Sequence, residues 1–307
     1  MGQKEVKRLS DWAKWNIITY RAALNAGIEA VVLKVINAQN KPDGRFYEHM
    51  EGCNGVGLPV VGGYTYSYAN TVDKARKAAS AFVETGAPKG IRTMWLDLED
   101  KSMMGLGHKI IDIINIYRQA AGDADMAFGI YTGAQFYNPY LKPYAKEIAD
   151  IPIWWARYPF VKEYTPTMPE PDKKYLPTGM DIAGWQYTSR GVIPGASGYV
   201  DLDVWYRGEP QQNTAYEITV EYNPFAEPVA SVKIGSVGND AMWVQWCLWR
   251  FGLLLTDGVP DKSKITGCID SECQSAIKES QRRLGLAGKD VDGIVGQVTR
   301  ALYKKVC

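Results

Sequence analysis

The chain has 307 residues, of which 46% are hydrophobic and 22% are charged. This length favours one large domain together with a small one. The 35 Lys and Arg residues nearly balance the 34 Asp and Glu residues. The balance argues against electrostatic capture of nucleic acid or of an anionic membrane, so we expect neither as a partner.

The N-terminal sequence, MGQKEVKRLSDWAKW, lacks the apolar centre of a secretory signal. No apolar run approaches the roughly 18 residues that are needed to span a bilayer. We therefore expect a protein made in the cytoplasm without a signal peptide, and any action outside the cell requires another route of release.

Histidine and cysteine are sparse. His49 and His108 are the two histidines, and they lie far apart without a partner pattern, which weakens a Ser-His-Asp, Cys-His or zinc-hydrolase interpretation. No Gly-rich phosphate fingerprint follows a predicted strand. We therefore expect no metal and no cofactor. The five cysteines are expected to be plain thiols, at positions 53, 247, 268, 273 and 307.

Over residues 1–208, short strand-like runs alternate with helix-like segments. Strands rich in Val, Ile, Tyr and Trp are expected at residues 5–9, 29–36, 59–67, 93–99, 126–133, 151–158, 181–189 and 198–206. Helices with apolar residues at three-to-four spacing and a closing Gly are expected at residues 14–27, 71–86 and 108–122. This alternation indicates an α/β barrel or a doubly wound sheet. The last three strands follow one another without helices between them.

The character of the sequence changes at residues 209–231, where Pro, Asn and Gln accumulate, so we predict a linker there with a short strand at 215–222. Amphipathic helices are then expected at 237–253, 268–286 and 296–305. Residues 232–307 are therefore predicted to form a small all-α domain of three helices.

The stretch MWLDLED (94–100) ends a predicted strand with two carboxylates, Asp97 and Glu99. Alternation places both on one face, about 6 to 7 Å apart at their Cα atoms. Trp95 precedes them on that face, and an apolar wall raises a carboxyl pKa, so one acid can stay protonated. A protonated Glu beside a carboxylate is what glycosidic bond cleavage needs. An isolated Asp-x-Glu is more often a solvated strand end or a helix cap, so the context decides.

That context favours a carbohydrate groove. The acidic pattern recurs at the last strand, where Asp201 and Asp203 share one face. Taken singly, aromatic residues at strand ends usually belong to a core, but here they recur on successive strands. They are Tyr64, Tyr66, Tyr131, Trp154, Tyr158, Trp185 and Tyr187.

Residues 1–208 resemble a glycoside hydrolase family 25 lysozyme, an endolysin-type muramidase. The matching segments are LSDW (9–12), GGYTYS (62–67), LDLE (96–99), IYTG (130–133), WWARY (154–158) and WQYTSRGVIPGASGYVDLD (185–203). The resemblance implies an irregular TIM-like (β/α)5(β)3 barrel. It also implies cleavage of the β-1,4 bond between N-acetylmuramic acid and N-acetylglucosamine in bacterial peptidoglycan.

The same resemblance implies roles for individual residues. Glu99 is expected to be the proton donor, Asp97 the stabiliser of the positively charged intermediate, and Asp201 the matching acid on the last strand. Substrate binding is implied for Tyr64, Tyr66, Tyr131, Trp154, Tyr158, Trp185, Gln186 and Asp203, the last at a position where the family often has Asn. We expect a monomer that reaches the wall by holin-type release, lysis or delivery in a phage particle.

The first strand departs from the family pattern, which usually opens with Asp-x-Ser-x-Trp. Ser10 and Trp12 match, but Arg8 stands at the Asp position, and Asp11 would have to face the other way to replace it. An inward Arg8 would lower the pKa of the neighbouring acids. This favours an alternative function, a catalytically impaired peptidoglycan-binding protein. A chitinase-like barrel with a D-x-E motif is a third interpretation.

Residues 232–307 resemble the peptidoglycan-binding domain type 1, which implies anchoring to the wall. The matching segments are GNDAMWVQWCLWRFGL (238–253), AIKESQRRLGL (276–286) and VDGIVGQVTRAL (291–302). The DG-x-x-G-x-x-T motif is present as Asp292, Gly293, Gly296 and Thr299. An earlier half-copy has Cys273 where Thr is expected. A dimerising helical bundle with an ordinary Trp core is the alternative.

Overall fold

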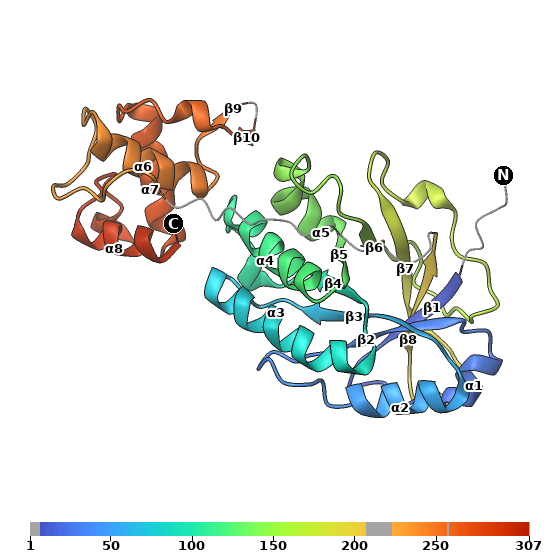
Figure 1. Ribbon diagram of the computed structural model, residues 1–307. Coiled ribbons are helices and arrows are strands. Elements are labelled where there is room, and N and C mark those ends of the chain that lie inside the picture. Colours follow the sequence, from blue (N-terminus) through green and yellow to red (C-terminus); the bar gives the residue numbers. More distant parts are fainter. Residues whose placement is uncertain (1–6, 207–222, 257, 307) are drawn as a thin grey trace. The chain divides into compact units, whose positions relative to one another are not determined.

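The computed structural model describes residues 7–206, 223–256 and 258–306 (Figure 1). The chain divides into two compact units, which we describe separately. The first unit holds the large sheet, and the second holds the C-terminal helices together with Met104–Ile113 and Asn138–Ala145. The strand predicted at 215–222 and most of the predicted linker lie outside the described residues, so the proposed domain boundaries stay a prediction.

Eight strands close into a barrel in chain order. They are β1 (Lys7–Trp12), β2 (Ala30–Lys34), β3 (Val60–Tyr66), β4 (Thr93–Asp97), β5 (Ala127–Gly133), β6 (Ile153–Ala156), β7 (Ile182–Gly191) and β8 (Val200–Trp205). Neighbouring strands from β1 to β7 are parallel, whereas β8 is antiparallel to both β7 and β1. The barrel expected from the sequence is confirmed, and the reversal of β8 is a feature that the sequence did not reveal.

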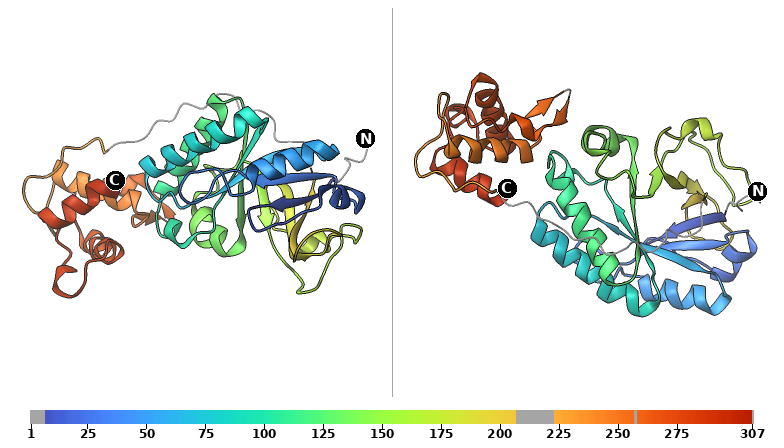
Figure 2. Two further views of the ribbon diagram at one scale, coloured as in Figure 1. Left: turned by 90° about the horizontal axis from the view of Figure 1, so that it is seen from below. Right: turned by 45° about the horizontal axis from the view of Figure 1, so that its top comes forward.

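Helices cover the outside of these strands (Figures 1 and 2). They are α1 (Tyr20–Asn25), α2 (Phe46–Val56), α3 (Val72–Gly86) and α4 (Lys109–Asp123), and the three-residue α5 (Ala134–Phe136) follows β5. The predicted α3 and α4 are confirmed, while α1 is shorter than the predicted 14–27. The single-turn elements are η1 (Ala87–Lys89), η2 (Lys101–Met103), the π-helical η3 (Tyr137–Leu141), η4 (Lys142–Tyr144) and η5 (Lys173–Tyr175). Between β6 and β8, where the structure describes every residue, η5 is the only helical element.

Helix α2 was missed because its sequence, FYEHMEGCNGV, contains two glycines, which disfavour a helix interior. One of them is required by packing. A Cβ atom at Gly52 would lie 2.0 Å from the ring of Tyr20 in α1. The helix is held instead by its buried face, to which Phe46 and Met50 contribute.

Three tryptophans fill the barrel interior. Trp95, Trp154 and Trp205 meet edge to face, with ring centroids 5.1 to 5.9 Å apart. Glycines make room for them, because a Cβ at Gly129 would lie 2.2 Å from Trp95, and one at Gly184 would lie 2.3 Å from Trp205. The interior below the strand ends is therefore a packed core rather than a channel.

The second unit contains α6 (Asn239–Arg250), α7 (Ser271–Arg283) and α8 (Gln297–Val306), as the sequence predicted. It also has a short hairpin, β9 (Leu255–Thr256) and β10 (Val259–Pro260), and the turns η6 (Lys262–Lys264) and η7 (Gly288–Asp290). The tryptophans at 243, 246 and 249 are buried in its core.

Gln281, at the end of α7, holds the loop that leads to α8. Its side-chain oxygen accepts a 2.9 Å hydrogen bond from the Gly293 amide. Its amide group donates to the Ile294 carbonyl at 3.0 Å and to the Thr299 hydroxyl at 3.3 Å. Because Gln281 is buried, these bonds fix the backbone of the loop.

Gln245, in α6, repeats this arrangement one helix earlier. It accepts from the Gly267 amide at 2.7 Å and donates to the Cys268 carbonyl at 2.9 Å. The sulfur of Cys273 lies 3.4 Å from its amide nitrogen, in the place that the Thr299 hydroxyl takes in the other copy. The unit therefore contains two copies of one structural motif, and the first is the half-copy expected from the sequence.

Within the described ranges, none of the helices combines the length and the apolar content that crossing a bilayer requires.

Candidate active site

A cavity of about 150 Å³ lies at the carboxyl ends of the parallel strands and at the start of β8. This is the end of a TIM-like barrel at which active sites form. Eleven side chains line it: Asp11, Lys34, Tyr64, Tyr66, Asp97, Glu99, Tyr131, Trp154, Tyr158, Gln186 and Asp201.

Nine of the eleven residues predicted for the site are in this wall. The other two, Trp185 and Asp203, are not. Trp185 is the strand neighbour of Gln186 and points to the opposite side, where its indole nitrogen donates to the Arg157 carbonyl at 2.8 Å. Asp203 is buried behind the wall and accepts a 2.9 Å bond from the indole nitrogen of Trp154. Direct substrate contact by either residue is therefore not favoured by the geometry.

Asp97 and Glu99 occupy the same cavity, although β4 ends at Asp97 and Glu99 belongs to the loop that follows. Asp97 is buried, whereas Glu99 is half-buried and closer to the opening. Burial raises the pKa of both carboxyls, and the charge of Glu99 raises the pKa of Asp97 further. Two such neighbours titrate as a pair, so the pair retains a proton at a pH at which exposed acids have lost theirs.

Asp11 is a wall residue that the sequence interpretation did not include. Leu9 packs in the barrel interior and Asp11, two residues further on, faces the same way. Arg8 lies on the other face and is exposed. The expectation that the first strand presents Arg8 in place of an acid is thus wrong, because Arg8, Ser10 and Trp12 lie on the outward face of β1 and Asp11 lies on the inward face.

The first-strand motif can instead be aligned three residues later. Asp11-Trp12-Ala13-Lys14-Trp15 retains the Asp and the Trp of Asp-x-Ser-x-Trp, with Ala13 at the Ser position. Asp11 and Trp15 are four residues apart, which is the spacing of the Asp and the Trp in the family motif. This spacing was the signal that could have identified Asp11. Burial raises the pKa of Asp11 to about 6, although Gln186 and Lys34 act in the opposite direction.

Ser10 and Trp12, which carried the predicted match, have a structural task on the other face of β1. The Trp12 indole donates to the Ser10 hydroxyl at 2.8 Å, and that hydroxyl donates to the Asp201 carbonyl at 2.6 Å. The bonds tie the start of β8 to β1. Burial raises the pKa of Asp201 to about 8, with further contributions from the charges of Asp11 and Glu99.

Lys34, at the end of β2, is the second wall residue that was missed. Among the eleven side chains of the wall it carries the only positive charge. Its charge lowers the pKa of Asp11 and of Asp97 against the effect of burial. The available signal was a single Lys within the otherwise apolar run AVVLKVI, residues 30–36.

Gln186 connects the two sides of the cavity. Its side-chain oxygen accepts hydrogen bonds from the hydroxyls of Tyr131, at 2.8 Å, and Tyr158. Its amide nitrogen must therefore point the other way, and it donates to Asp11 at 2.7 Å. The two tyrosines thus fix the direction in which Gln186 presents a donor to the acid.

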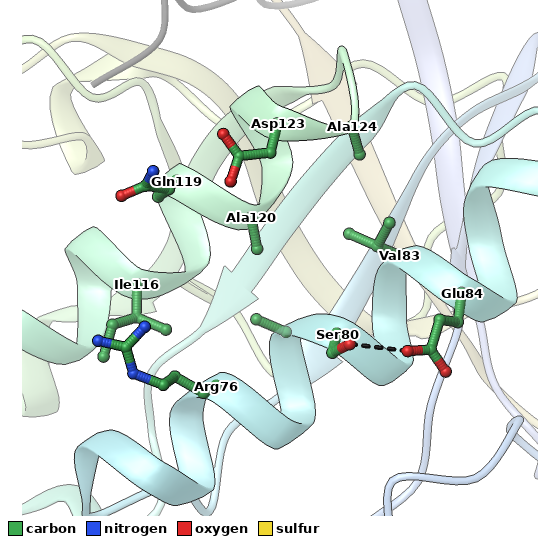
Figure 3. Close-up of a pocket in the computed structure, with 10 residues that line it drawn as sticks. Arg76, Ser80, Val83, Glu84, Ile116, Gln119, Ala120, Asp123 and Ala124 are labelled. Carbon is green, nitrogen blue, oxygen red and sulfur yellow. Dashed lines mark hydrogen bonds between the residues drawn. The ribbon is translucent and has the colours of Figure 1, made fainter. Parts of the chain in front are cut away.

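A larger hollow, about 530 Å³, lies between α3 and α4 on the outside of the barrel (Figure 3). Arg76 and Glu84 on α3 and Gln119 and Asp123 on α4 line it, and Ser80 donates to Glu84 at 2.7 Å. Its lining holds no pair of desolvated acids within the described residues, so we assign the chemistry to the smaller cavity at the strand ends.

A closed α/β barrel with buried acids, one of them able to hold a proton, and aromatic side chains around a cavity at its strand ends is the architecture of a glycoside hydrolase.

Comparison with known proteins gives the particular family. The sequence pattern of Glycosyl hydrolases family 25 matches residues 10–196. The chain is 25% identical over 289 residues to the autolytic lysozyme of Clostridium acetobutylicum. This alignment covers 92% of this chain and 76% of the clostridial protein. The chain belongs to glycosyl hydrolase family 25, and it is a lysozyme of the muramidase type.

Solved structures share the barrel. A bacterial lysozyme from Streptomyces coelicolor aligns with a TM-score of 0.52 and 21% identity over 65% of this chain and 91% of its own. The catalytic domain of the endolysin ply40 from bacteriophage P40 of Listeria monocytogenes aligns with a TM-score of 0.50 and 22% identity, over 66% of this chain and 95% of its own. At these identities the likeness concerns the fold.

Proposed function

We propose that Glu99 is the proton donor of the reaction and that Asp97 stabilises the positive charge that develops on the sugar. The difference in burial between the two acids carries this assignment. Glu99 is the half-buried member, so it can reach the oxygen of the leaving sugar, whereas Asp97 lies deeper in the wall. Burial raises the pKa of both acids, and we assign the proton that the pair retains to Glu99, because a general acid must be protonated.

Asp97 can act only in its ionised form, because a neutral carboxyl offers no charge to an oxocarbenium-like centre. Lys34 supports that form by lowering the pKa of Asp97. Asp11 and Asp201 face the same cavity from β1 and β8. We assign to these two acids the orientation of the sugar, with Asp201 protonated near neutral pH because its pKa is about 8.

We propose peptidoglycan as the substrate and the β-1,4 bond between N-acetylmuramic acid and N-acetylglucosamine as the bond that is cleaved. The relatives support this class of substrate, since one is named as an autolytic lysozyme and another as an endolysin. The aromatic wall is suited to a sugar chain, because rings of Tyr and Trp offer flat apolar faces with polar tips.

The test is digestion of purified peptidoglycan, with identification of the new reducing sugar. A muramidase releases N-acetylmuramic acid at the reducing end, and Glu99→Gln lowers the rate by about 100-fold or more because the proton donor is lost. Glu84→Gln, in the outer hollow, is the matched control and leaves the rate unchanged. Reducing ends of N-acetylglucosamine alone would exclude this bond, and a Glu99→Gln variant as active as the wild type would exclude Glu99 as the donor.

We further propose that the C-terminal unit anchors the enzyme to the wall. The two copies of the glutamine motif, at Gln245 and Gln281, support a domain of the type that the sequence resembles. Tethering raises the effective concentration of an insoluble substrate without new contacts in the active site. A chain that ends at residue 206 should therefore lose activity on intact walls while it keeps its rate on soluble fragments. An equal loss on both substrates would contradict the anchoring role.

A further inference from the structure

Asp203 lies inside the barrel but outside the cavity. On β8 it pairs with Leu9 of β1 on one side and with Gln186 of β7 on the other. Its side chain is 1% exposed, so solvent and a bound sugar cannot reach it directly. One carboxyl oxygen accepts the 2.9 Å hydrogen bond from the Trp154 indole. An acid in such a place needs an explanation, because a buried charge is costly unless it is paired.

The other oxygen of Asp203, Oδ2, has no donor among the described residues. Asp203 pairs with Leu9 on β1, and Asp11, two residues further on and on the same face, has its side chain within interaction range of the Asp203 carboxyl. Two ionised carboxylates only accept hydrogen bonds, so no bond forms between them unless one of them carries a proton. A single proton would at once satisfy Oδ2 of Asp203 and remove the repulsion between the two acids.

The surrounding bonds indicate which acid holds that proton. Asp11 already accepts a hydrogen bond from Gln186, whose direction is fixed by Tyr131 and Tyr158. Asp11 also lies in the same cavity wall as Lys34. Among the described residues, the hydrogen-bond donor to Asp203 is the Trp154 indole, and neither a cation nor an amide group donates to it. The donors therefore favour charge on Asp11, and the proton belongs on Asp203.

We propose that Asp203 is a positioning residue, which keeps a proton and donates it in a hydrogen bond to Asp11, so that Asp11 is held as an oriented, ionised acceptor in the cavity wall. The proposal deepens the function proposed above and depends on the same site. The chain of contacts then runs from the two tyrosines through Gln186 to Asp11, and from Asp11 through Asp203 to Trp154.

The electrostatic surroundings agree with this arrangement. Burial raises the pKa of Asp203 well above its usual range, and the charges of Asp11 on β1 and Asp201 on β8 raise it further. The charge of Asp203 also raises the pKa of Tyr187 on β7. Two cations act on this set: Lys34 on β2 lowers the pKa of Asp11, and Arg8 on β1 lowers the pKa of Tyr187.

Activity of two variants tests the donor role. Asp203→Asn keeps a donor for Asp11 and an acceptor for Trp154, so it should retain kcat/KM within about threefold of the wild type. Asp203→Leu has a similar size but neither group, and it should lower kcat/KM by about tenfold or more. If Asp203→Asn loses as much activity as Asp203→Leu, the charge of Asp203 is required and the proposal is wrong.

The pH dependence of folding stability tests, without any activity measurement, whether Asp203 holds the proton. If Asp203→Leu does not fold, this measurement alone decides between the two outcomes. A folded wild type that holds one more proton than the unfolded chain loses stability as pH rises. From about pH 5 to pH 7, the folding equilibrium constant of Asp203→Asn, relative to wild type, should therefore rise by about tenfold per pH unit. Urea unfolding across this range measures the ratio, with the exposed Asp125→Asn as control.

A ratio that does not change with pH would mean that Asp203 is ionised in the folded protein, and would overturn the proposal. The outcome for the proposed function is separate. If the wild type fails to hydrolyse peptidoglycan, that function fails, while the linkage measurement still reports where the proton lies.

Discussion

The ammonium group of Lys34 lies 5.5 Å from the centroid of the Tyr66 ring, and both side chains line the cavity that holds the acids. The tyrosine therefore keeps the cation at the wall, from where its charge lowers the pKa of Asp97 and Asp11. The cation thus offsets part of the effect of desolvation on these two acids.

Replacing Lys34 by Met should move the acidic limb of the pH–activity profile to higher pH by about one unit. Asp97 must be ionised to act, and activity is lost as pH falls through its pKa. Removal of the cation raises that pKa, so the loss begins at a higher pH. Lys174→Met is the matched control, because Lys174 lies at a similar distance, 5.4 Å, from the ring of Tyr175 outside the cavity. An unchanged limb in Lys34→Met would contradict the role of the cation.

Gln186→Leu should lower kcat by about 10- to 100-fold, because it removes the donor to Asp11 and leaves the hydroxyls of Tyr131 and Tyr158 without their acceptor. Steady-state kinetics on soluble peptidoglycan fragments measures the effect. Gln39→Leu, on the exposed loop after β2, serves as the control. If both variants keep the wild-type kcat, the orientation of Asp11 does not limit the reaction.

Gly129→Ala should destabilise the barrel by about 1–3 kcal/mol, because the added methyl group would overlap the ring of Trp95 in a packed interior. Gly122→Ala, in α4, has open space around the added atom and should be neutral or slightly stabilising. The free energy of unfolding in urea, compared between the two variants, tests the packing. Equal stability of the two would mean that the barrel interior yields more readily than its close contacts indicate.

Cys273→Thr should stabilise the C-terminal unit by about 0.5–1 kcal/mol, because a hydroxyl is a better acceptor for Gln245 than a thiol. The converse change, Thr299→Cys, should weaken the bond from Gln281 by a similar amount. Hydrogen exchange of peptides from α6 to α8 in the full-length chain reports the local stability. Opposite signs for the two variants are the expected result, and equal signs would mean that the two motif copies are not equivalent.

Much of the fold could be predicted because it depends on local patterns. The strands carry runs of β-branched and aromatic residues, and α3 and α4 have clear helical periodicity. Helix α2 could not be predicted, since its glycines are explained only by a contact with Tyr20, which is distant in sequence. The reversal of β8 is also invisible in a strand's own sequence, because alternation of side chains is the same in both directions.

The candidate site was predictable where an acid or aromatic residue followed a clear strand, as at Asp97 and Tyr131. It was not predictable on β1, where the motif was aligned three residues early, and a shift by an odd number of residues exchanges the two faces, so Arg8 took the place of Asp11. Lys34 was overlooked for a different reason. A lone cation in an apolar strand reveals its role only when the acids of other strands are seen around it.

The reversed direction of β8 has a consequence for how this barrel can diversify. On the parallel strands, the acids precede the loops at the cavity end of the barrel. Asp201 instead follows such a loop, residues 192–199, because β8 begins at that end. Insertions in residues 192–199 would alter the rim of the cavity next to Asp201. The hydrogen bond from the Ser10 hydroxyl to the Asp201 carbonyl would keep the acid itself in place. Changes in this loop could therefore alter which glycan binds while the catalytic acids stay in position.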